Sequence, residues 1–435
     1  MKVKANRETW WLHPVTAVFL ATVPFIVSAH LLPESSYLEL WKAQKHLNGV
    51  SLGLTLVTLL MFALGYALSL ASRPSQSPAP LIERKHLAPL FLLSAALAIA
   101  GYLIWLVLLL RDVGASTLMA TFHADSGANY AIREAGSTIP GVTTMTQFGI
   151  AAVILGGLLI RTGQNRRPVL VILFVLILLS VLRAFIWSER LAVIELIIPL
   201  GLMTLKPELR PGSRFRLTYT LAPFLGAAAL YLYFTGFEFF RSWSATYAAG
   251  EVSLWSFAWT RLAGYYITAL NNGMLMYSEL GRLPLPYYTL EWLWKLPGVS
   301  YLLPYDQVTG VSLGAQGDIL RVMANPEFTN PSGIFPYFLD FGPAAYLFWV
   351  FCGAAAGFAY RAFREERLAG LLFYPFLFVG LIELGRVPYL TSGRAFPAWI
   401  FLFLSYFLLK GRSPVTAPEM SSLGSPSYEA HRSLP

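Results

Sequence analysis

Long apolar runs alternate with short polar connections along nearly the whole chain. A helix that crosses a bilayer needs roughly 20 mostly apolar residues. Ten runs approach this length, and we predict a helix in each of them: 14–32, 49–72, 87–110, 142–160, 169–187, 191–205, 217–235, 336–360, 368–385 and 395–409. The pattern therefore predicts an all-α, polytopic membrane protein with about ten transmembrane helices.

One long stretch interrupts this alternation. Residues 236–335 hold many polar and charged side chains between the seventh and eighth predicted helices. We therefore divide the chain into an N-terminal bundle of seven helices, a large extracytoplasmic loop, a C-terminal group of helices and a tail: 1–235, 236–335, 336–410 and 411–435. The Pro- and Ser-rich composition of the tail predicts that it is disordered.

Composition agrees with a membrane location. The chain is 56% hydrophobic and only 13% charged, whereas soluble domains carry about 25% charged residues. The single cysteine, Cys352, lies in an apolar run, so no internal disulfide forms and a thiolate metal site is not expected. No cofactor is predicted.

The net charge of +9 raises the possibility of nucleic-acid binding, but membrane topology explains this charge better. Cytoplasmic connections of membrane proteins are rich in Lys and Arg. If both termini are cytoplasmic, every short cytoplasmic connection is basic: 73–86, 161–168, 206–216 and 361–367. Most of the 32 Lys and Arg residues then lie on that side, and 236–335 faces outward. The first apolar run lacks a cleavage pattern, so we interpret it as a retained helix.

Ionisable residues gather near the outer ends of the predicted helices: Arg183, Glu189, Arg190, Glu195, Glu383, Arg386 and Arg394. Arginine beside a membrane span is costly and usually has a specific role. A guanidinium binds phosphate through two parallel hydrogen bonds and stays charged. We therefore expect an outward-facing pocket that suits a lipid pyrophosphate. The alternative is that these residues form structural pairs or anchor lipid headgroups.

The predicted loop adds cations and aromatic residues: Arg241, Arg261, Arg282, Lys295, Arg321, Trp243, Trp255, Tyr265, Tyr266, Trp292 and Trp294. Aromatic rings beside cations suit the binding of sugars, whose apolar faces stack on them. The alternative is that the aromatic residues form the interfacial belt found in any membrane protein.

Three carboxylates in or just after this loop are candidates for a general base: Asp318, Glu327 and Asp340. A glycosyl transfer needs a base for the acceptor hydroxyl and positive charge for the departing pyrophosphate. The sequence has no Asp-x-Asp motif and no His/Asp cluster, so we favour arginine over metal for the second task. The alternative for Asp340 is a carboxylate stabilised by a helix N-terminus.

The layout resembles that of the bacterial oligosaccharide repeat-unit polymerases, the Wzy-type O-antigen and exopolysaccharide polymerases. Ser188-Glu189-Arg190 resembles the Ser-x-Arg at the outer start of a helix in this family, and Arg190 to Gly201 fits its Arg-x10-Gly spacing. Two further segments resemble family motifs: Tyr130-Ala131-Ile132-Arg133-Glu134, and Thr329-Asn330-Pro331-Ser332 followed by Leu339-Asp340-Phe341-Gly342. No second Arg-x10-Gly lies in the long loop.

The resemblance implies an enzyme of the bacterial inner membrane that joins undecaprenyl pyrophosphate-linked repeat units at the periplasmic face. It implies catalytic roles for Arg190, Asp340, Asp318 and Glu327. It implies substrate binding by nine residues: Arg133, Arg183, Arg241, Arg261, Tyr265, Trp243, Asn330, Arg386 and Arg394. A flippase and a chain-length regulator are the implied partners. Three alternatives remain: an O-antigen ligase-like enzyme, a polysaccharide flippase or other transporter, and a structural membrane protein.

Overall fold

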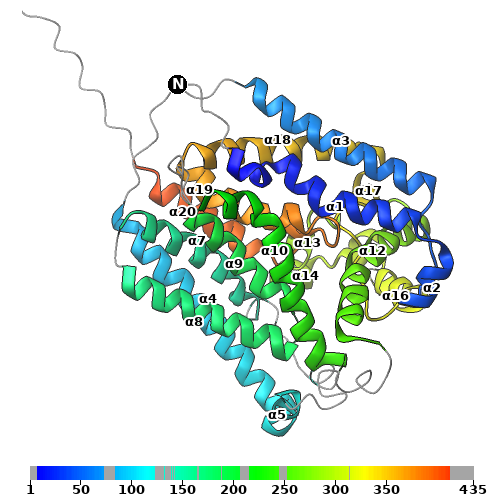
Figure 1. The fold of residues 1–435 in the computed structure, drawn as a ribbon, viewed down its shortest axis with the longest axis horizontal. Coiled ribbons are helices and arrows are strands. Elements are labelled where there is room, and N and C mark those ends of the chain that lie inside the picture. The colour runs from blue at the N-terminus through cyan, green and yellow to red at the C-terminus, as the bar shows by residue number, and fades with distance from the viewer. Residues whose placement is uncertain are drawn as a thin grey trace, which may run out of the picture.

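The computed structural model describes residues 7–72, 84–122, 132, 139, 141, 143–163, 166–187, 189–205, 215–243, 252–312 and 314–411. Helices account for the regular structure of these residues, and no β-strand occurs among them (Figure 1). The all-α prediction is therefore confirmed. Arg133 and the tail beyond residue 411 lie outside the described residues.

Each of the ten predicted apolar runs contains a helix. In chain order these are α1 Pro14–Leu31, α3 Gly49–Ala71, α4 Arg84–Val113, α7 Phe148–Arg161, α8 Arg166–Trp187, α9 Leu191–Thr204, α10 Phe215–Glu238, α18 Ala345–Arg364, α19 Leu368–Ile382 and α20 Phe396–Leu409. Within the described ranges, seven helical stretches are long and apolar enough to cross a membrane. The apolar helices α9, α19 and α20 are shorter, with 14, 15 and 14 residues.

Short elements complete the described helices. At the N-terminus they are η1 Arg7–Leu12 and α2 Glu34–Trp41, and before α7 they are α5 Ala115–Phe122 and η2 Thr143–Gln147. A π-helical turn, η3 Phe239–Trp243, continues α10. Apart from the long helix α12, Leu254–Leu280, the remaining elements are α13 Glu291–Trp294, α14 Pro297–Leu302, α15 Tyr305–Thr309, α16 Gly314–Met323, α17 Pro336–Phe341, η4 Gly342–Ala344 and η5 Tyr389–Thr391.

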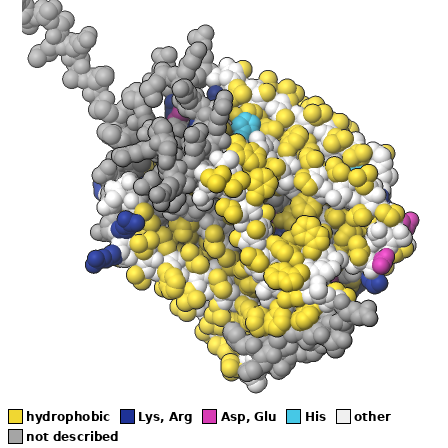
Figure 2. Space-filling view, in the orientation of Figure 1, with side chains coloured by type: hydrophobic (Ala, Val, Ile, Leu, Met, Phe, Trp, Pro, Cys, Tyr) yellow, Lys and Arg dark blue, Asp and Glu magenta, His cyan; other side chains and the backbone are white. Residues whose placement is uncertain are grey.

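The outer surface of the bundle is apolar. Large hydrophobic side chains are exposed on α3, α4, α8, α10 and α20. In Figure 2 the visible face is mostly hydrophobic, and its charged side chains lie near two opposite edges. Apolar surface of this extent is costly in water, and it is the surface expected of helices that face lipid.

Polar contacts tie the connections together at the end of the bundle near η1, which we call the N-terminal end. Arg161 donates hydrogen bonds to the carbonyl oxygens of Met203 at 2.5 Å and Leu205 at 2.8 Å. Arg361 donates to the carbonyl oxygen of Ser72 at 3.1 Å. These arginines belong to the connections that the sequence assigns to one side of the membrane.

The connections predicted for the other side meet at the opposite end, which we call the loop end. The Trp41 indole donates to the carbonyl oxygen of Thr260 at 3.0 Å, and the Asn325 amide donates to the carbonyl oxygen of Trp41 at 2.8 Å. Figure 1 shows α19 on one side of the molecule and α2 and α16 on the other. The helices thus run alternately between the two ends.

The described part of residues 236–335 contains a long helix that the prediction of a loop did not include. This is α12, Leu254–Leu280, a helix of 27 residues that packs against α1 and α10. Its buried amides hold two other segments, since Asn271 binds the backbone of Gln44 and His46 and Asn272 binds that of Phe328. The missed helix therefore fixes the predicted loop onto the bundle.

Two glycines let α12 make these close contacts. A Cβ at Gly264 would lie 2.6 Å from the Trp41 indole nitrogen, and one at Gly273 would lie 2.5 Å from the carbonyl oxygen of Pro331. Real Cβ atoms essentially never approach other heavy atoms this closely. A larger residue at either position would push the neighbouring segment away.

Candidate functional site

A cavity of about 340 Å³ lies at the loop end of the bundle, among α9, α10, α12 and two connecting segments. Several residues that the sequence analysis selected line it: Glu189, Arg190, Tyr265, Glu327, Asn330, Glu383, Arg386 and Arg394. The rest of the lining includes Leu191, Ile194, Leu230, Tyr233, Phe234 and Leu262. The cavity thus has a charged part and an apolar part.

Arg190 is held in place from several sides. It precedes the first residue of α9, and its side chain is 12% exposed. Nη1 lies 3.0 Å from Oε1 of Glu238, and Nη2 donates to the Tyr265 hydroxyl at 3.0 Å. The guanidinium also lies 4.0 Å from the Phe234 ring centre and 4.8 Å from that of Tyr265. These contacts fix its plane at the wall of the cavity.

Glu238 connects Arg190 to a second arginine. Its carboxylate is fully buried, and its Oε2 lies 2.8 Å from Nε of Arg261. Nη1 of Arg261 lies 2.6 Å from Oε2 of Glu327, which is 52% exposed and lines the cavity. Burial alone would lower the pKa of Arg261, but the charges of Glu238 and Glu327 outweigh burial and raise it. Arg261 is therefore held in its charged form despite its burial.

The sequence analysis did not select Glu238. It ends α10, where the helix turns into the π-helical segment Phe239–Trp243. The sequence could have indicated Glu238, because it is a lone carboxylate at the end of an apolar run, and an ionisable group beside a membrane span usually has a role. Only the fold shows that this carboxylate bridges two arginines.

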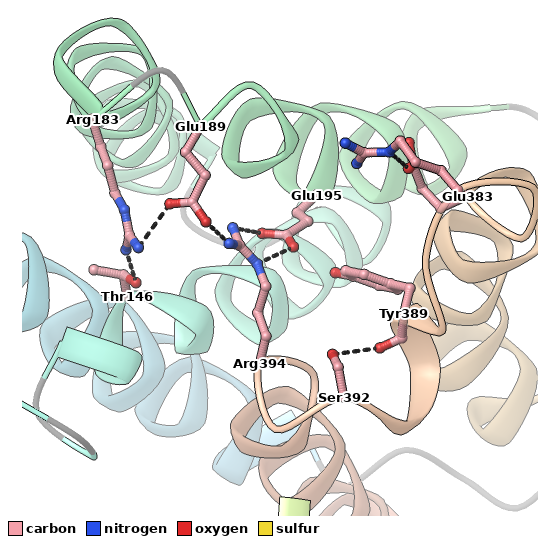
Figure 3. Close-up of polar contacts among 9 residues, drawn as sticks. Thr146, Arg183, Glu189, Glu195, Glu383, Tyr389, Ser392 and Arg394 are labelled. Atoms are coloured by element: carbon pink, nitrogen blue, oxygen red, sulfur yellow. Dashed lines mark hydrogen bonds and ion pairs between the residues drawn. The ribbon is translucent and has the colours of Figure 1, made fainter. Parts of the chain in front are cut away.

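A second group of charges surrounds Arg394. The guanidinium binds Glu195 in bidentate fashion, with Nε 2.6 Å from Oε1 and Nη2 2.8 Å from Oε2 (Figure 3). Its Nη1 contacts Glu189, whose other oxygen lies 2.8 Å from Nη2 of Arg183. Figure 3 shows this alternating row running from Arg183 to Glu195, with Tyr389 on its far side. The row holds the start of α9 against the turn that precedes α20.

Arg386 differs from the other arginines of the site. Its Nε donates to Glu383 at 2.7 Å, but its two terminal nitrogens contact no hydrogen-bond partner in the described part of the chain. Burial acts to lower the pKa of this guanidinium, and the adjacent charge of Glu383 more than offsets it and raises the pKa. Because Arg386 lines the cavity, it presents a permanent charge and unused donors to a ligand.

The backbone that faces Arg386 is tightly fixed. The Asn272 amide donates to the carbonyl oxygens of Phe328 at 2.5 Å and Asn330 at 3.2 Å. Gly333 donates its N–H to the carbonyl oxygen of Leu384 at 2.9 Å. Ser332 is buried at a positive φ of 65°, a conformation that costs free energy and persists only where the surroundings enforce it. Pro326, Glu327, Thr329 and Asn330 of the segment 326–333 line the cavity, and the bonds of the segment hold this part of the wall in place.

Asp340 does not line the cavity. One of its oxygens accepts the backbone N–H groups of Tyr287 and Tyr288, at 2.8 and 3.1 Å. The other accepts the backbone N–H and the hydroxyl of Thr289, each at 2.7 Å. Both oxygens are therefore saturated by a connection about 50 residues earlier in the chain. In the described structure Asp340 therefore anchors this connection. Its expected catalytic role, and the alternative of a helix N-terminal carboxylate, stay predictions that these contacts do not support.

Other expected residues also lie away from the cavity. Asp318 is 64% exposed and pairs with Arg321 at 2.9 Å. Trp243 donates to the carbonyl oxygen of Val252 and stacks on Phe239. Neither is among the residues that line the cavity, so the roles expected for them, a base at Asp318 and a sugar platform at Trp243, stay predictions that this cavity does not support. The side chains of Arg241 and Arg133 lie outside the described residues.

The arrangement can bind an anion and move a proton. A glutamate partner holds the guanidinium in place at each of five arginines: Arg183, Arg190, Arg261, Arg386 and Arg394. Glu327 remains half-exposed beside the cavity. Among the described residues no group of three or more His, Cys, Asp or Glu side chains could hold a metal ion.

Neither a protein-family model, nor a curated protein, nor a solved structure matches this chain.

Proposed function

We propose that this protein is a glycosyltransferase that polymerises oligosaccharide repeat units linked to a lipid pyrophosphate, with its site in the cavity at the loop end. The carrier would be undecaprenyl pyrophosphate, and the product an O-antigen or exopolysaccharide chain. The proposal includes ten membrane crossings in the bacterial inner membrane, with both termini in the cytoplasm. The Lys- and Arg-rich connections at the N-terminal end support this orientation.

The observation that carries the proposal is the composition of the cavity. Arg190 and Arg386 stand beside an apolar wall from α9 and α10, at one end of a bundle with a lipid-facing surface. A pyrophosphate matches guanidinium groups through charge-assisted hydrogen bonds. A lipid carrier matches the apolar wall. Tyr265 and Asn330 add polar groups that suit sugar hydroxyls.

The chemistry follows from these positions. The acceptor hydroxyl attacks the anomeric carbon of the donor glycan and forms the new glycosidic bond. The bond between that carbon and the pyrophosphate oxygen breaks, and its electron pair leaves with the pyrophosphate. Glu327 takes the proton of the attacking hydroxyl. Arg386 and Arg190 stabilise the negative charge that develops on the leaving group.

Deletion of the gene in its host tests the proposal. The extracted glycans and lipid-linked intermediates are separated on a gel and stained for sugar. We expect long chains to disappear while single repeat units remain, and Arg386→Ala to reproduce this result with normal protein in the membrane. Polymer that stays on the carrier lipid would instead identify a ligase-like enzyme, and units trapped at the cytoplasmic face would identify a flippase. An unchanged ladder would refute all three.

A further inference from the structure

Consecutive helices α9 and α10 pack against different neighbours. The helix α9 packs against α7, α8 and α19, whereas α10 packs against α12, η1 and η3. Most of α10 is uncovered, since only 6% of its apolar span is buried. The apolar part of the cavity lies between these two helices.

Contacts near its ends hold α10. Toward the N-terminal end, Pro223 lacks the N–H that would bind the carbonyl oxygen of Tyr219, and the Trp11 indole donates to that oxygen at 2.9 Å. Toward the loop end, Glu238 binds Arg190 at 3.0 Å. These contacts fix α10 at both ends while leaving its middle uncovered.

The open positions of α9 share one face. Ile194 and Ile197 are three residues apart, and Gly201 follows four residues later, which is the spacing of neighbours along one side of a helix. Ile194 lines the cavity and Ile197 is 48% exposed. A Cβ at Gly201 would meet no atom within 4 Å. This face therefore leads from the cavity toward the N-terminal end without being covered.

The helix α10 has a matching face. Gly226, Leu230 and Tyr233 follow the same spacing of four and three residues. Leu230 and Tyr233 line the cavity, and a Cβ at Gly226 would meet no atom within 4 Å. Because α9 and α10 run in opposite directions, both faces lead away from the cavity along the bundle. Each face begins at residues that line the cavity beside Arg190 and Arg386. We call the two faces together the furrow: Ile194, Ile197 and Gly201 of α9 with Gly226, Leu230 and Tyr233 of α10.

We propose that this furrow holds the isoprenoid chain of a pyrophosphate lipid whose head group lies in the cavity. The inference rests on the proposed function, and it adds the place where the isoprenoid chain of the carrier lies. The furrow is continuous with the cavity, and the arginines at its loop end complement the charge of a pyrophosphate. A chain seated there would carry its head group directly to the unused donors of Arg386.

Photochemical labelling tests this assignment. The purified protein in lipid nanodiscs is irradiated with geranylgeranyl pyrophosphate that carries a benzophenone, and the labelled peptides are mapped by mass spectrometry. We expect label at Ile197 and Gly226, and we expect an unlabelled polyprenyl pyrophosphate to compete with it. Labelling that falls elsewhere, or that phosphatidylglycerol reduces equally well, would overturn the proposal, because the furrow would then be ordinary lipid-facing surface.

Variants separate this proposal from the proposed function. Gly226→Trp fills the furrow, and its matched control Ala228→Trp places the same side chain on an exposed part of α10 about 200° away around the helix. We expect Gly226→Trp to lower labelling and chain elongation at least tenfold while inorganic pyrophosphate still binds, and the control to change neither. Normal elongation by Gly226→Trp with intact pyrophosphate binding would refute the furrow alone. Failure of the wild-type protein to bind pyrophosphate would refute the proposed function.

Discussion

Glu238→Gln is the most informative change to the candidate site. The substitution keeps the shape of the side chain but removes the carboxylate charge that links Arg190 to Arg261. Glu238 is fully buried, and the side chains of the two arginines are 12% and 9% exposed. Water cannot replace the lost charge, and the two guanidinium groups then repel each other.

The expected loss of stability follows from this burial. Removing one partner of a buried ion pair costs about 3–5 kcal/mol, because the remaining charge stays buried without compensation. Tyr265 and Glu327 still contact the arginines, so we expect a value within this range despite the two broken pairs. Glu327→Gln is the control. Glu327 is 52% exposed, and the loss of an exposed partner costs about 1 kcal/mol or less.

Unfolding in mixed micelles with increasing SDS measures both variants against the wild type. We expect Glu238→Gln to lower the free energy of unfolding several times more than Glu327→Gln. Among correctly folded molecules, we expect Glu327→Gln to reduce the glycan ladder more than Glu238→Gln does, because Glu327 is the proposed base. If Glu238→Gln unfolds within about 1 kcal/mol of the wild type, Glu238 does not hold the two arginines and the account of the site is wrong.

Three further predictions concern the surroundings of the site. Gly273→Ala should lower the free energy of unfolding by about 1–3 kcal/mol through overpacking and reduce chain elongation, because its Cβ would press on the carbonyl oxygen of Pro331. Gly298→Ala is the control and should change neither, because its Cβ would meet no atom within 4 Å. Asp340→Ala leaves buried N–H groups unpaired, so it should lower the free energy of unfolding by about 3 kcal/mol or more and speed proteolysis near residue 287, whereas unchanged proteolysis would contradict its role as an anchor. Burial lowers the pKa of His46 below 6.5, so its contribution to the free energy of unfolding should be fully present above about pH 6.5 and be lost as the pH falls through the folded pKa. A His46→Gln protein whose free energy of unfolding keeps the same pH dependence would exclude His46 as the cause.

The apolar pattern was sufficient to find the helices that face lipid. Few polar residues interrupt these helices, and the bilayer sets their approximate length, so composition alone identifies them. The helix α12 escaped this test because Arg261, Asn271 and Asn272 interrupt its apolar residues. Those polar groups are buried against partners far away in the sequence, and a pattern along one chain does not contain such partners.

The same distinction explains the site. Arg190 and Arg386 were selected because arginine at a helix end is costly wherever it occurs, and both line the cavity. The anchoring contacts of Asp340 could not be predicted because its partners, the amides of residues 287–289, are brought to it only by folding. Glu238 was missed for the same reason. Residue type indicated which groups need a partner, and the fold alone identified the partner.

The most direct test of the central claim is a reaction with purified components. The protein in lipid nanodiscs is incubated with repeat units linked to undecaprenyl pyrophosphate, and products are followed by gel and by mass spectrometry of the released lipid. We expect a ladder of glycans, one molecule of undecaprenyl pyrophosphate released for each bond formed, and loss of both with Arg386→Ala. Intact substrate after incubation with folded wild-type protein, with no ladder and no released carrier, would contradict the claim.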